Sequence, residues 1–81
     1  MNFEQELTLA LVVISSWMED DRRYPGTDKK IIRAWSGYQY EVLESLERQG
    51  LIKMGRNHRS LEITTKGKML GEKILQQLKN V

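Results

Sequence analysis

The chain has 81 residues, of which 40% are hydrophobic and 30% charged, and its formal net charge is +2. This composition predicts one globular domain, near the lower size at which a core holds without crosslinks. The absence of cysteine excludes disulfides, thiolate zinc sites and cysteine nucleophiles. The longest apolar run, Leu9 to Ile14, is too short to cross a bilayer and has no signal-peptide features, so we expect a cytoplasmic protein without membrane contact.

Charge is distributed unevenly along the chain. Residues 1–20 contain four acidic residues and no basic one, whereas residues 51–81 contain seven Lys and Arg against two Glu. Such segregation permits an anionic partner without requiring one.

A first helix is predicted over residues 3–20, with Asn2 as its cap. The β-branched run at residues 12–14 leaves a strand interpretation open for that part. Because apolar residues fill both sides of the helix, we expect it to be buried on all sides or shared with a second copy in a homodimer. Val13 and Trp17 are therefore candidate contacts, either as core residues or as part of an interface.

A polar loop is predicted over residues 21–30, since Tyr24-Pro25-Gly26 is a turn signal. A strand is predicted over residues 31–35. Alternation along this strand places three residues on one face: Ile31, Arg33 and Trp35.

A second helix is predicted over residues 37–49. Ser36 and Gln39 fit a capping box at its start, and Gly50 is the expected left-handed residue at its end. Trp35 and Tyr40 fall at the two positions of a hydrophobic staple.

A hairpin over residues 51–64 and a final helix over residues 65–79 complete the predicted elements. Thr64 or Thr65 is expected to cap the final helix. Two glycines lower its helix propensity, and close packing of the backbone against another element would explain them: Gly67 and Gly71.

Two stretches of the sequence match family patterns. The motifs Gln49-Gly50-Leu51-Ile52 and Leu61-Glu62-Ile63-Thr64-Thr65-Lys66-Gly67 resemble the C-terminal part of winged-helix regulators of the MarR and PadR types. Arg33-Ala34-Trp35-Ser36-Gly37-Tyr38-Gln39-Tyr40 resembles the "RAW-x-G-aromatic-x-aromatic" pattern of a small uncharacterised bacterial domain family. The second resemblance implies a fold and a bacterial origin but no activity.

These features together predict an α+β domain of winged-helix type over residues 1–81, with the order α–β–α–β–β–α and a three-stranded antiparallel sheet. DNA-binding winged helices place two helices between the first strand and the wing, and only one fits here. That helix exposes three carboxylates that would be repelled by phosphates, so we do not expect it to read the major groove: Glu41, Glu44 and Glu47.

The candidate nucleic-acid contacts lie on the hairpin and form a basic tip: Lys53, Arg56, Asn57, His58 and Arg59. Such a tip could lie along duplex DNA, although the same residue types are typical of any exposed turn. The aromatic group Trp35, Tyr38 and Tyr40 could anchor a partner or form a corner of the core. The candidate partner-binding residues are Val13, Trp17, Trp35 and Tyr38.

No group of residues has the spacing of a metal site or of a catalytic constellation, since His58 is the only histidine. We therefore expect no metal, cofactor, small-molecule substrate or enzymatic activity. Two hypotheses for a non-enzymatic binding module stay open. The chain is either a small DNA-associated regulator that uses its basic hairpin, or a protein-interaction or dimerisation domain that does not bind DNA.

Overall fold

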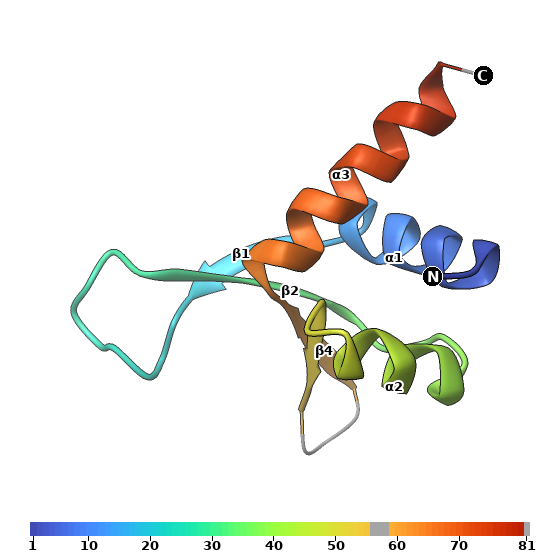
Figure 1. Cartoon of the computed structure of the whole chain (residues 1–81). Coiled ribbons are helices and arrows are strands. Elements are labelled where there is room, and N and C mark those ends of the chain that lie inside the picture. The colour runs from blue at the N-terminus through green and yellow to red at the C-terminus, as the bar shows by residue number, and fades with distance from the viewer. Residues whose placement is uncertain (56–58, 81) are drawn as a thin grey trace.

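The computed structural model describes residues 1–55 and 59–80. Within them, three helices and a four-stranded antiparallel sheet form a mixed α+β fold (Figure 1). In chain order the elements are α1 (Phe3–Ile14), β1 (Trp17–Asp20), β2 (Lys30–Trp35), α2 (Tyr40–Arg48), β3 (Ile52–Met54), β4 (Ser60–Ile63) and α3 (Thr65–Lys79). The strands lie side by side in the order β1-β2-β4-β3. The α+β class is confirmed, and the expected three-stranded sheet is wrong because β1 adds a fourth strand.

The predicted helix over residues 3–20 is too long, since α1 ends at Ile14. The hydroxyls of Ser15 and Ser16 donate to backbone carbonyls of the last turn, at 2.7 and 2.6 Å, and so satisfy groups that a longer helix would have used. Residues 17–20 then pair antiparallel with β2. Trp17 therefore lies on an edge strand instead of a helix. The loop between β1 and β2 extends away from the rest of the fold (Figure 1).

The second helix also begins later than predicted, at Tyr40 instead of residue 37. The backbone N–H of Ser36 donates to the carbonyl of Arg59 at 3.2 Å, which prolongs the pairing of β2 with β4. Gln39 is the N-cap residue and makes no side-chain capping bond, so the predicted capping box is wrong. The predicted end is confirmed, because Gly50 has φ 76°.

The hydrophobic core lies between the helices and one face of the sheet. The strands contribute Ala34, Ile52, Leu61 and Ile63 to it, and the helices contribute buried residues that include Leu9, Val12, Leu43, Leu46 and Ile74. The hydroxyl of Thr64 accepts a hydrogen bond from the backbone N–H of Gly67 at 3.0 Å and caps α3, as expected.

Close backbone packing at the two glycines of α3 is confirmed. A Cβ atom on Gly67 would lie 1.9 Å from the carbonyl oxygen of Leu51, and one on Gly71 would lie 2.4 Å from Cγ2 of Val13. Val13 is thus half-buried in the contact between α1 and α3. This packing fixes both helices on the core side of the sheet.

Candidate functional site

The second face of the sheet carries the residues that alternate with the core positions. Trp17, Arg33 and Trp35 lie there, and Arg33 stands directly opposite Trp17 in the pairing of β1 with β2. The pairings of β4 bring Ser60, Glu62 and Lys53 onto the same face. These side chains, with residues of the β1–β2 loop, line a cleft of about 570 Å³. We call this surface the open face.

Two tryptophans form the apolar part of the open face. The ring centroids of Trp17 and Trp35 lie 5.2 Å apart, with the rings tilted by 49°. Trp35 is 64% exposed, whereas Trp17 is half-buried. The predicted staple between Trp35 and Tyr40 is wrong, because α2 begins at Tyr40 with Gln39 as its N-cap and the two residues therefore do not occupy the staple positions. Large aromatic side chains in water are available for stacking or for burial by a partner.

Glu19 contacts both Trp17 and the neighbouring Arg33. Its carboxylate accepts a hydrogen bond from Nε1 of Trp17 at 3.1 Å and lies 3.4 Å from Nε of Arg33. The guanidinium of Arg33 also donates to the hydroxyl of Ser60. Arg33 is therefore fixed between three strands, with its charge beside the tryptophans.

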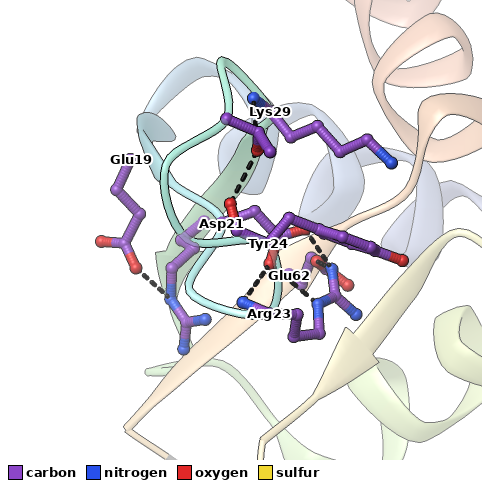
Figure 2. A network of polar contacts seen from close by, with 8 residues as sticks. Glu19, Asp21, Arg23, Tyr24, Lys29 and Glu62 are labelled. Atoms are coloured by element: carbon purple, nitrogen blue, oxygen red, sulfur yellow. Dashed lines mark hydrogen bonds and ion pairs between the residues drawn. The ribbon is translucent and has the colours of Figure 1, made fainter.

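A charged network ties the β1–β2 loop to the sheet, as Figure 2 shows. Asp21 is only 6% exposed and accepts two side-chain hydrogen bonds from Arg23, both at 2.9 Å. Arg23 also donates to Glu62 of β4 at 2.9 Å. At the other end of the loop, the backbone N–H of Asp21 donates to the carbonyl of Lys29, whose ammonium lies 3.9 Å from the ring centroid of Tyr24. The first residues of the loop, Asp21 to Arg23, are thus held at the rim of the cleft, and the remainder of the loop projects from it.

The protonation states in this network follow from its hydrogen bonds. The side-chain hydrogen bond from Arg23 lowers the pKa of Asp21 below its usual value, against the opposing effect of burial. The same bond, with the nearby charge of Glu62, raises the pKa of Arg23. The carboxylate and the guanidinium are therefore both charged at neutral pH.

The structure brings together only part of the predicted site. Trp17, Trp35 and Lys53 line the same cleft, although they were expected in two separate places. Arg59 is exposed just before β4, and Arg56, Asn57 and His58 lie outside the described residues. Tyr38 is half-buried against the core, beside a second hollow lined also by Tyr40, Leu43 and Met54.

Sequence reasoning missed the roles of Glu19, Arg23 and Glu62. The assignment of residue 19 to a helix concealed its position beside Trp17, and no local pattern connects Arg23 to a residue 39 positions away. The shared face of Ile31, Arg33 and Trp35 was predicted by alternation and is confirmed.

Neither a metal site nor a membrane-spanning helix is found in the part of the chain that the structure describes. Within residues 1–55 and 59–80, His, Asp and Glu form no group of three or more that could hold a metal ion. No helix in these ranges has the length and apolar character needed to span a bilayer.

Comparison with protein families gives one match. A family model described as Domain of unknown function (DUF6429) covers residues 4–81. The chain belongs to this family. Neither the curated proteins nor the solved structures contain a match to this DUF6429 chain. The family description assigns no activity, so a role for the DUF6429 chain must be argued from the open face.

Proposed function

We propose that this DUF6429 chain is a non-enzymatic module that binds single-stranded nucleic acid on the open face of its sheet. The observation that carries the proposal is the pair Trp17 and Trp35, side by side on adjacent strands, with Arg33 directly opposite Trp17 in the strand pairing. Proteins that hold single strands combine aromatic platforms, on which bases stack, with cations that contact the backbone. Trp35, with 64% of its surface exposed, can accept a base without rearrangement of the fold.

The charges around the tryptophans support a phosphate-bearing ligand. Arg22 and Lys53 line the cleft and form no ion pair within residues 1–55 and 59–80. The carboxylates on the same face are each matched with a guanidinium: Glu19 with Arg33, and Asp21 and Glu62 with Arg23. A backbone phosphate would therefore meet free cations and neutralised acids.

The structure favours binding of single strands on the open face over binding of α2 in the major groove of a duplex. The carboxylate of Glu47 on α2 accepts a hydrogen bond from the backbone N–H of Met54 at 2.8 Å, so it stabilises the edge of β3. Glu41 is exposed on the same helix and Glu44 is half-buried. A helix with this role and charge is a poor reader of the major groove.

Duplex DNA is the second candidate ligand, through the β3–β4 hairpin. Lys53 and Arg59 are both exposed, one on each side of the hairpin. The order α2, β3, β4, α3 is also consistent with a winged-helix ancestry, in which the hairpin would be the wing and the chain a small DNA-associated regulator. This alternative predicts a preference for duplexes and a loss of binding when both basic residues are replaced.

Intrinsic fluorescence tests the proposal directly, because the only two tryptophans of the chain lie on the open face. Titration with an oligothymidine should quench the fluorescence saturably, and binding should weaken steeply between about 50 and 200 mM salt. Anisotropy of a labelled oligothymidine provides an independent signal. By this signal Trp35→Ala should weaken binding about 5- to 150-fold, and Trp35→Phe should retain part of it.

Tyr40→Ala is the matched control, since Tyr40 is an aromatic residue with similar exposure (57%) at the start of α2. It should bind as tightly as the unaltered protein. Absence of binding to single strands at low salt would overturn the proposal. A preference for the duplex, abolished by Lys53→Ala with Arg59→Ala, would favour the hairpin instead.

A further inference from the structure

Large apolar side chains remain exposed along one side of α1. Phe3, Leu11 and Ile14 are the exposed ones, and with the half-buried Leu7 between them they form a single stripe of apolar residues spaced three or four positions apart. Phe3, Leu11 and Ile14 are 66%, 53% and 64% exposed. The opposite side of α1 is in the core through Leu9 and Val12. This helix therefore has a second apolar surface that its own fold does not cover.

The apolar side of α3 continues past the core. Gly67, Gly71 and Ile74 are buried on that side, and the same spacing leads to Leu78, which is 42% exposed. Figure 1 shows the C-terminal half of α3 extending beyond the other elements. An inward-facing leucine at this end lies where a neighbouring molecule would be needed to bury it.

The total exposed surface indicates how much area is left uncovered. The chain exposes 5864 Å², whereas a compact monomer of 9.5 kDa is expected to expose about 5,000 Å². The radius of gyration of 12.7 Å likewise exceeds the value of about 11.7 Å expected for 81 residues. The excess of about 800 Å² is comparable with the share that one partner contributes to an interface of standard size, and the projecting β1–β2 loop contributes to it together with α1 and α3.

The charges of the two helices are complementary. The charged residues of α1 are acidic, Glu4 and Glu6. The charged residues of α3 are mostly basic, with Glu72 as the exception: Lys66, Lys68, Lys73 and Lys79. In a two-fold dimer the same patch faces itself, so α1 of each protomer can lie against α3 of the other and both contacts are attractive.

We infer that this chain forms a two-fold dimer, in which a second copy covers the α1 stripe and the projecting end of α3. The interface lies on the helical side of the sheet, whereas the tryptophans lie on the open face. The dimer is therefore independent of the nucleic-acid proposal, and each can fail without the other. A dimer would present two open faces to one ligand.

Sedimentation velocity over a micromolar-to-millimolar concentration series tests the inference. The protein should sediment as a dimer, and Phe3→Asp or Leu11→Asp should raise the dimer Kd by about 100-fold, because each change acts at two symmetric positions. Both side chains are exposed, so far-UV circular dichroism should show intact folds. Met69→Asp is the matched control, since Met69 is 67% exposed on the opposite side of α3, and it should leave the Kd unchanged.

Charge reversal tests the pairing of α1 with α3. Glu4→Lys with Glu6→Lys should weaken the dimer, and adding Lys79→Glu, which lies nearer the Leu78 side of α3 than Met69 does, should restore it in part. Failure of this restoration would overturn the pairing of the two helices. A monomer at every concentration, or a dimer that persists when Phe3→Asp and Leu11→Asp are combined, would overturn the interface itself.

Discussion

Gly67→Ala tests the glycine at which an added Cβ atom would meet the nearest neighbour, among Gly26, Gly37, Gly50, Gly67 and Gly71. The added Cβ would lie 1.9 Å from the carbonyl oxygen of Leu51 and 2.8 Å from its carbonyl carbon. The obstacle is backbone, and the same oxygen accepts a hydrogen bond from the N–H of Thr64 at 3.1 Å and shares the hydroxyl proton of Thr64, at 3.0 Å, with the closer carbonyl of Gly50 at 2.7 Å. Relief of the clash must therefore displace the start of α3 or break these bonds.

The cost follows from these contacts. Overpacking costs about 1–3 kcal/mol, and each weakened hydrogen bond adds about 1 kcal/mol. The higher helix propensity of Ala returns about 1 kcal/mol at most. The net loss should be about 2–4 kcal/mol, out of a total of about 4–12 kcal/mol for a domain of 81 residues.

Urea denaturation followed by circular dichroism measures this loss. Gly37→Ala is the control, because no atom lies within 4 Å of its added Cβ, and it should change the unfolding free energy by less than about 0.5 kcal/mol. The melting temperature of Gly67→Ala should fall by about 10–20 °C. A loss below about 0.5 kcal/mol in Gly67→Ala would refute the reasoning, since it would mean that the backbone of Leu51 moves freely.

Three further substitutions probe other features of the fold. Thr64→Val removes the cap of α3 with little change in shape and should cost about 1 kcal/mol in urea denaturation, against no loss for the neighbouring Thr65→Val. Gly50→Ala places a side chain at φ 76° and should cost about 1–2 kcal/mol, and an unchanged midpoint would contradict the left-handed geometry. The carboxylate of Asp21 has a lowered pKa, so it stabilises the fold above about pH 4, and this contribution is lost as the pH falls through its folded pKa. Asp21→Asn should therefore be less stable at pH 7 and lose less stability between about pH 4 and 2, whereas the exposed Asp28→Asn should follow the unaltered protein.

The C-terminal half of the fold was predictable because its signals are local. Gly50 ends α2 through its own backbone conformation, and Thr64 caps α3 through a bond to a residue three positions away. The alternation of Ile31, Arg33 and Trp35 likewise assigned one face of β2 correctly. Each of these features depends on residues that are close in sequence, so a sequence pattern can predict it.

The strand β1 could not be inferred in the same way. Trp17–Asp20 continues the helical spacing of α1, and only its pairing with β2 makes it a strand. The position of Trp17 beside Trp35 depends on that pairing, as does the bridge from Arg23 to Glu62. The open face is thus a product of contacts between distant residues, and this is why sequence patterns divided it into two separate candidates.

The placement of the aromatic residues leaves α1 and α3 without tryptophan or tyrosine fluorescence of their own. Neither α1 nor α3 contains Trp or Tyr, since the three tyrosines lie at positions 24, 38 and 40. Emission from the tryptophans therefore reports melting of the sheet, whereas far-UV circular dichroism is dominated by the helices. If the two signals change at the same urea concentration, the two layers unfold as one cooperative unit. If α1 and α3 detach first, circular dichroism will change at a lower urea concentration than the tryptophan emission. Comparison of the two signals would then detect a partly unfolded form without an added label.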